Sequence, residues 1–294
     1  MYKSILLKDL TNTETVNYLQ HAIGPRPICF ASTIDKEGNV NLSPFSFFNL
    51  FSTHPPILVF SPSRRGRDNT TKHTLENILE VPEVAINIVS YEMVHQVSLS
   101  SCEFPKGTNE FIKAGLTPEA SQIIHPPRVK ESPVQFECKV LEVKPLGTEG
   151  GAGNLVIAEI LLMHINTDIL NDKGNIDQLK MDVVARFGGN WYARVNADNL
   201  FEVEKPNTQL GIGVDALPEN IRNSSILSGN DLGKLANVNE YPIIDTSFYD
   251  DKLKNIIQYF SIDPDELEKE LHAYAKELLS EGKAREAWQV LLGL

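Results

Sequence analysis

Aromatic, proline and hydroxyl side chains are concentrated in residues 41–56, which read NLSPFSFFNLFSTHPP. Four phenylalanines and three prolines surround three serines, Ser43, Ser46 and Ser52. A flat aromatic cofactor is held by apolar walls that carry a few well-placed hydrogen-bond donors. A packed corner of a β-barrel, with its serines satisfied internally, would have a similar composition. Both interpretations of this segment remain open on its residues alone.

Four cations gather in residues 61–77, SPSRRGRDNTTKHTLEN, although the chain as a whole is acidic. They are Arg64, Arg65, Arg67 and Lys72. We expect a helix to begin here with Asn69 or Thr70 as its cap, and a helix N-terminus attracts anions through its free N–H groups and its dipole. So many converging donors suit a phosphate better than a carboxylate. The alternative is a solvated basic loop.

The elements that must position these residues are mostly short strands. Thr11 and Glu14 have capping-box spacing and predict a first helix that ends near Gly24. Strands are expected at residues 27–34, 40–43, 55–63, 83–90, 134–146 and 154–165, and helices at 69–79, 91–99 and 109–114. The last two strands and the glycine-rich turn between them form the strongest predicted hairpin. Because strands and helices do not alternate regularly, the pattern favours a mainly β fold, an antiparallel barrel with inserted helices.

The character of the sequence changes after about Phe201. A turn-rich connection follows, and from Ser247 the chain is expected to be helical. Asp263 and Pro264 supply a cap and a proline at the first position of one helix, and residues 284–292 form the last. We therefore predict two parts, residues 1–203 and a C-terminal helical extension at 204–294, whose helix hairpin docks on the barrel or on a second subunit.

Charge and composition exclude several classes of function. The net charge is −12 and the pI is about 5.1, which argues against nucleic acid and against an anionic membrane surface. Three cysteines without a CxxC pair, and no recognisable signal or membrane-spanning segment, predict a cytoplasmic protein. The sequence contains no metal-binding motif and no catalytic triad pattern, so no metal ligand and no catalytic side chain is predicted.

Three segments together carry a resemblance. They are RPICFASTIDKEGNVNLSPFSFFN, KHT at residues 72–74 and RFGGNWYAR at residues 186–194. In this order and spacing they resemble the flavin reductase-like, FMN-binding split-barrel family, which includes flavoredoxin-like proteins. The resemblance runs from Ala22 to Tyr192. It implies an antiparallel split β-barrel, an FMN cofactor and a homodimer with its sites at the subunit interface.

The resemblance also assigns residues to the FMN phosphate. Lys72 and Thr74, with Ser32 or Arg67, would hold it. Further cofactor-binding candidates are Thr33, Ser61 and His73. His73 stands where many relatives carry an acidic residue, so its role stays open.

The remaining assignments concern the flavin ring. Phe30 would lie beneath it, on the strand at residues 27–34. Three residues of the aromatic segment would border the isoalloxazine: Ser46, Phe47 and Phe48. Arg186 and Tyr192 would close the site, from the same subunit or from its neighbour.

The function that the resemblance implies is NAD(P)H:flavin oxidoreduction, in which electrons pass from NAD(P)H through the bound flavin to an acceptor. One alternative is an FMN-binding electron-transfer protein that does not oxidise NAD(P)H itself. Another is a non-catalytic flavin carrier. The helices after Ser247 are expected to stabilise the protein or face a partner, with no part in the flavin chemistry.

Overall fold

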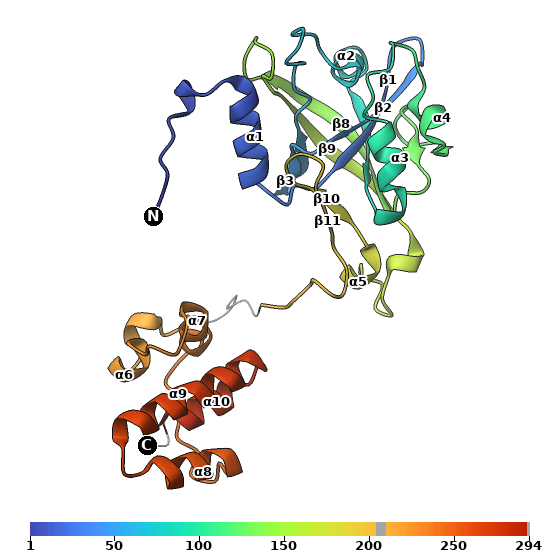
Figure 1. Ribbon diagram of the computed structural model, residues 1–294. Coiled ribbons are helices and arrows are strands. Elements are labelled where there is room, and N and C mark those ends of the chain that lie inside the picture. Colours follow the sequence, from blue (N-terminus) through green and yellow to red (C-terminus); the bar gives the residue numbers. More distant parts are fainter. Residues whose placement is uncertain (204–209, 293–294) are drawn as a thin grey trace. The chain divides into compact units, whose positions relative to one another are not determined.

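The computed structural model describes residues 1–203 and 210–292. The chain divides into two compact units, Met1–Phe201 (unit 1) and Glu202–Leu294 (unit 2). In Figure 1 unit 1 runs from blue to yellow and unit 2 from orange to red. Unit 1 is built on one large sheet, whereas the described part of unit 2 is helical.

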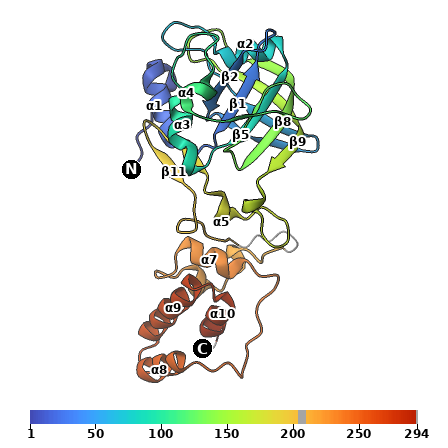
Figure 2. The same cartoon turned by 90° about the vertical axis from the view of Figure 1, so that its right-hand side faces the viewer.

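Unit 1 contains a seven-stranded antiparallel sheet in the order β2-β1-β5-β8-β9-β4-β3. Its strands are β1 (Cys29–Ile34), β2 (Val40–Phe45), β3 (Phe48–Thr53), β4 (Pro56–Phe60), β5 (Glu83–Ile88), β8 (Val134–Pro145) and β9 (Asn154–Ile165). The two edge strands, β2 and β3, are consecutive in the chain and are joined only by Ser46 and Phe47. Because the link is so short, the sheet must curl until its two edges come close together, which makes a barrel that is split between β2 and β3. Figure 2 shows the curled sheet with β1, β2, β5, β8 and β9 labelled.

The β8–β9 hairpin is confirmed. Its strands pair from Val134↔Ile165 to Pro145↔Asn154, with two β-bulges on the way. The bulges increase the local twist of long strands, which helps a sheet of this length to close.

β3 is an element that the sequence pattern did not predict, because residues 48–53 were interpreted only as part of the aromatic segment. It is an edge strand whose side chains are mostly exposed, and its pairing with β4 shifts between Leu50 and Ser52. A strand without a buried face has no hydrophobic alternation by which it can be recognised.

Four helices surround the barrel (Figure 1). They are α1 (Asn12–Ala22), α2 (His73–Glu80), α3 (Val94–Leu99) and α4 (Glu110–Ala114). The Thr11–Glu14 capping box of α1 is present as predicted. The predicted start of α2 is wrong. Its N-cap is Lys72, because Asn69 adopts a left-handed turn (φ 58°) that a helix cannot include.

Two clusters of apolar side chains form the core of unit 1. One fills the barrel with residues such as Phe45, Phe60 and Val156, and the other lies between the sheet and helices α3 and α4. Phe30 belongs to the second cluster and is fully buried. The smaller elements of unit 1 are β6 (Pro118–Glu119), β7 (Arg128–Val129), α5 (Gln178–Met181), β10 (Val184–Arg186) and β11 (Tyr192–Arg194).

Unit 2 has its own hydrophobic core, so its helix pair does not need to dock on the barrel or on a second subunit to bury its apolar residues. Its α-helices in the described residues are α6 (Glu219–Arg222), α7 (Gly229–Ala236), α8 (Asp251–Phe260), α9 (Pro264–Ser280) and α10 (Ala284–Leu292). Leu217, Ile221 and Leu235, from the segment expected to be a loose connection, pack with Leu271 and Trp288. The helix pair therefore has partners within unit 2. Residues 204–209 of the connection lie outside the described residues.

The described residues contain neither a membrane-spanning helix nor a cluster of metal-binding side chains. None of their helices is both long enough and apolar enough to cross a membrane. They also contain no group of three or more histidine, cysteine, aspartate or glutamate side chains arranged to hold a metal ion.

Candidate functional site

Two adjoining cavities form one groove at the link between β2 and β3. They share a wall made of Pro44, Phe45, Ser46 and Ser101. The smaller, here called the cationic cavity, has a volume of about 380 Å³ and is lined by Arg64, Arg65, Arg67 and Lys72. The larger, the aromatic cavity, has a volume of about 710 Å³ and is lined by Phe45, Tyr91 and Tyr192. Both volumes lie in the range of small-molecule sites.

Positive charge dominates the cationic cavity. Lys72 is half-buried, and desolvation followed by the positive charge of Arg65 lowers the pKa of its ammonium group. The carboxylate of Glu103 lies between two of the arginines, with Oε1 3.3 Å from Nε of Arg65 and Oε2 2.8 Å from Nη2 of Arg67. Partly desolvated cations that repel one another favour an anion between them.

The cationic loop, residues 62–72, is held in shape from outside by the β8–β9 turn. The N–H of Arg64 donates to the carbonyl of Ala152 (2.8 Å), and the N–H of Gly151 donates to the carbonyl of Arg64 (3.0 Å). The two backbones approach so closely that a Cβ on Gly150 would lie 3.1 Å from atoms of Arg65 and Gly66. The glycines of this turn therefore also make room for the cationic loop.

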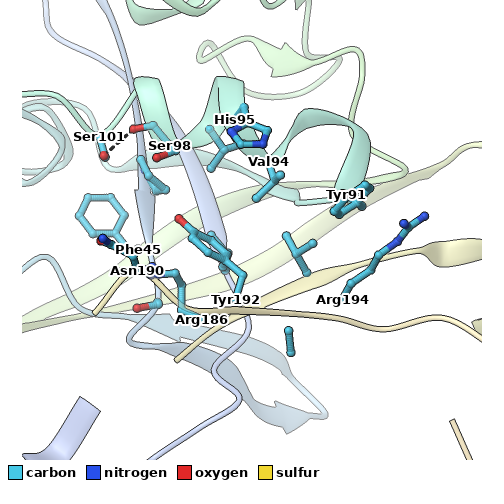
Figure 3. A pocket seen from close by; sticks show the side chains of 16 residues that line it. Phe45, Tyr91, Val94, His95, Ser98, Ser101, Arg186, Asn190, Tyr192 and Arg194 are labelled. Atoms are coloured by element: carbon cyan, nitrogen blue, oxygen red, sulfur yellow. Dashed lines mark hydrogen bonds between the residues drawn. The ribbon is translucent and has the colours of Figure 1, made fainter. Parts of the chain in front are cut away.

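Two arginines stack on two tyrosines in the aromatic cavity (Figure 3). The guanidinium carbon of Arg186 lies 4.5 Å from the ring centre of Tyr192, and that of Arg194 lies 3.8 Å from the ring centre of Tyr91. Arg194 is also paired with Asp182 at 2.7 Å. Arg186 instead donates to the carbonyl of Gly189, which leaves donors of its guanidinium available to a ligand.

Arg26 anchors the hairpin that carries Arg186 and Tyr192. Its main chain exchanges two hydrogen bonds with Arg186, of 2.9 and 2.8 Å. Its guanidinium donates to the carbonyls of Gln20 and Ile23 at the end of α1, and to that of Phe187 at 2.9 Å. One buried arginine thus ties α1 to the β10–β11 hairpin.

The structure brings most of the predicted site residues together. Ser46, Phe47, Ser61, Arg67 and Lys72 line the cationic cavity. Arg186 and Tyr192 line the aromatic cavity. Residues from three separate segments of the sequence, 46–47, 61–72 and 186–192, therefore meet at one groove.

Two further predicted residues lie beside the groove. His73 and Thr74 line a small cavity of about 20 Å³ that Lys72 also borders. Desolvation lowers the pKa of His73. The buried hydroxyl of Thr74 donates to Oδ1 of Asn41 at 2.6 Å, so it ties α2 to β2.

The other four predicted residues lie in the core, away from the groove. Phe30, Ser32 and Thr33 are fully buried on β1, where successive side chains point into the two core clusters. Phe48 packs against the core inside the barrel. None of these four residues borders either cavity, so they are not part of the candidate site.

Several lining residues were not predicted. Tyr91, His95 and Arg194 line the aromatic cavity, and Arg65 and Glu103 line the cationic one. Arg65 was noticed only as part of the charge cluster. Arg194 ends the motif at residues 186–194 but was given no role there, and Tyr91, His95 and Glu103 carry no local signal. Their proximity depends on how the segments around α3 and β11 fold onto the barrel; Figure 3 shows Tyr91, His95 and Arg194 at the aromatic cavity.

The groove combines features that suit a small aromatic ligand with an anionic group. The cationic cavity suits a phosphate, because four positive side chains converge there and one of them, Lys72, is partly desolvated. An aromatic ring fits against the wall of Pro44, Phe45 and Ser46, which the two cavities share. The aromatic cavity then leaves space beside the ring for a second molecule.

Comparison with known protein families gives a match over residues 23–180, to the family described as "Flavin reductase like domain". An uncharacterised protein of Aquifex aeolicus is 41% identical over 170 residues, which cover 58% of this chain and 84% of that protein. The family match ends before Arg186 and Tyr192, so the β10–β11 hairpin lies outside it.

Two solved structures share both sequence and fold with unit 1. Nitrilotriacetate monooxygenase component B from Bacillus cereus is 28% identical with a TM-score of 0.64, over 69% of this chain and 99% of that chain. A protein assigned as a flavin reductase with a split barrel domain, from Shewanella frigidimarina, is 28% identical with a TM-score of 0.58, over 68% and 96%. Because the family model matches more than half of the sequence and these barrels align, the chain belongs to the flavin reductase-like family and has its split-barrel fold.

Proposed function

We propose that the protein is an FMN-dependent NAD(P)H:flavin oxidoreductase whose flavin lies along the groove. The observation that carries this proposal is the shared wall. A cavity lined by cations and a cavity lined by aromatic rings adjoin at Pro44, Phe45 and Ser46, in a chain of the flavin reductase-like family.

The residues of the cationic cavity would hold the phosphate. Lys72 and Arg67 would donate charged hydrogen bonds, and Arg65 would add positive charge from a position fixed by Thr70 and Thr71. Ser61, beside the loop, supplies a further hydroxyl. Positive side chains can bind a phosphate without any proton transfer, so the site needs no acidic or basic catalyst for this task.

The aromatic cavity would hold the second reactant against the ring. The bound flavin would supply the hydride chemistry, so the protein's task is to place a donor such as NAD(P)H beside it. Tyr192 and Tyr91 offer flat surfaces for stacking, and the free donors of Arg186 attract an anionic group.

An optical titration tests this function. We expect the purified protein to show flavin absorbance bands, or to quench the fluorescence of added FMN, and we expect NADH or NADPH to bleach the bound flavin under anaerobic conditions. Failure to bind FMN contradicts the proposal. Binding without bleaching by either nicotinamide favours the electron-transfer or carrier alternative.

We also propose a homodimer in which each subunit completes its partner's site. Large apolar side chains are exposed along the edge strand β3 and the β8–β9 hairpin, namely Leu50, Phe51, Leu141, Leu161 and Met163. Phe47, which borders the groove, is 46% exposed. An apolar edge strand is a natural place for another chain to bind. Sedimentation should show a dimer, and a flavin-loaded monomer at micromolar concentration would refute this.

A further inference from the structure

A single carboxylate lies in the proposed phosphate position. Among the described residues that line the two cavities of the groove, only Glu103 is acidic. It belongs to the segment between α3 and α4, and it reaches the cationic loop from a different part of the chain. Its two oxygens contact Arg65 at 3.3 Å and Arg67 at 2.8 Å.

The arginines keep other partners if Glu103 moves away. Arg65 donates to the hydroxyl of Thr70 at 3.0 Å and to the carbonyl of Thr71. Arg67 also pairs with Asp68 at 3.2 Å. Arg65 therefore keeps its place beside the groove without the carboxylate, and Arg67 keeps Asp68 as an ion-pair partner.

Glu103 itself can leave easily. Its side chain is 44% exposed, so a rotated carboxylate would be solvated by water. Its hydrogen bond from Arg67, and then the charges of Arg67 and Arg65, keep its pKa below the usual range, so it is ionised at neutral pH. An ionised carboxylate and a phosphate cannot share the space between the same two arginines without strong repulsion.

We propose that Glu103 determines how strongly this site prefers phosphorylated flavins, because its carboxylate competes with the flavin phosphate for Arg65 and Arg67. The inference rests on the proposed flavin function. A flavin phosphate must displace Glu103, whereas riboflavin, which has no phosphate, leaves both ion pairs intact. Glu103 thus weakens FMN binding selectively, and this keeps the cofactor exchangeable.

The test is a fluorescence titration of the full chain with FMN and with riboflavin, before and after Glu103→Gln. We expect the Kd for FMN to fall about three- to tenfold, the scale of a few exposed charge interactions. The Kd for riboflavin should not change. The matched control is Glu80→Gln, which removes the same charge from an exposed position on α2 outside the groove and should alter neither Kd.

Two kinds of result would overturn the role proposed for Glu103 and leave the proposed flavin function intact. Weaker or unchanged FMN binding in Glu103→Gln would show that the carboxylate orients the arginines or is irrelevant to them. Equal tightening for both flavins would place its effect on the ring. Wild-type protein that binds neither flavin would overturn the proposed function, and the inference with it, before any variant is compared.

Discussion

Lys72→Ala is expected to weaken FMN binding at least tenfold and to leave riboflavin binding nearly unchanged. Lys72 lies at the N-cap of α2 and borders the cationic cavity. A hydrogen bond between two charged groups contributes about 1.5–3 kcal/mol, and roughly 1.4 kcal/mol is a factor of ten in affinity. Because riboflavin lacks the phosphate, the loss should appear only with FMN.

Partial burial makes Lys72 the strongest test of the phosphate position. Its ammonium group is already partly desolvated, so an anion that binds there gains more than it would from the exposed Arg67. Fluorescence titrations with both flavins measure the effect. Lys36→Ala, in the exposed β1–β2 turn, is the charge-matched control and should change neither affinity. An equal loss for both flavins would place the phosphate elsewhere.

The strands were predictable where one face is buried. Buried residues recur at alternate positions in the first half of β9 and are frequent in the first half of β8, and the bounds of both strands are within one residue of the predicted ones. β3 was missed because its exposed residues follow no such pattern. The start of α2 was misplaced because Asn69, a good cap residue by type, is held by Arg64 in a left-handed turn.

The two halves of the groove differed in how far the sequence could predict them. The cationic cavity could be inferred because four of its positive side chains lie within nine consecutive residues, 64–72. The aromatic cavity combines α3 with the β10–β11 hairpin. Contacts between such distant segments, for example Arg194 on Tyr91, depend on the tertiary fold and have no local pattern. Arg26 was recognised as part of a motif, but its role as an anchor appears only in its three carbonyl contacts.

The core of unit 2 could not be predicted from the composition of this segment. Leu217, Ile221 and Leu235 are separated by glycine, proline and asparagine, so this segment was interpreted as a connection. Only the packing shows that these side chains complete the core around α9 and α10. A unit with its own core can be destabilised without direct damage to the barrel, and this makes the role of unit 2 testable.

Trp288→Ala should destabilise unit 2 by about 3–5 kcal/mol, the usual cost of deleting a buried large aromatic side chain. Trp288 is fully buried, packs edge-on against Tyr241 and donates from Nε1 to the carbonyl of Leu235 at 3.0 Å. The substitution therefore removes apolar contacts and also leaves that carbonyl without its donor. Since whole domains are stable by only about 5–15 kcal/mol, much of unit 2 should unfold at lower urea concentration.

The same variant tests whether unit 2 takes part in the flavin chemistry. Every residue that lines the groove belongs to unit 1, so FMN affinity at low urea should stay within about twofold of wild type. Circular dichroism would follow the helices of unit 2, and flavin titration of the same sample would follow the barrel. Tyr259→Ala, an aromatic deletion at a side chain that is 79% exposed, is the control and should have little effect on either measurement. If Trp288→Ala abolished FMN binding while the barrel stayed folded, unit 2 would be part of the flavin site, and the assignment of that site to unit 1 alone would be wrong.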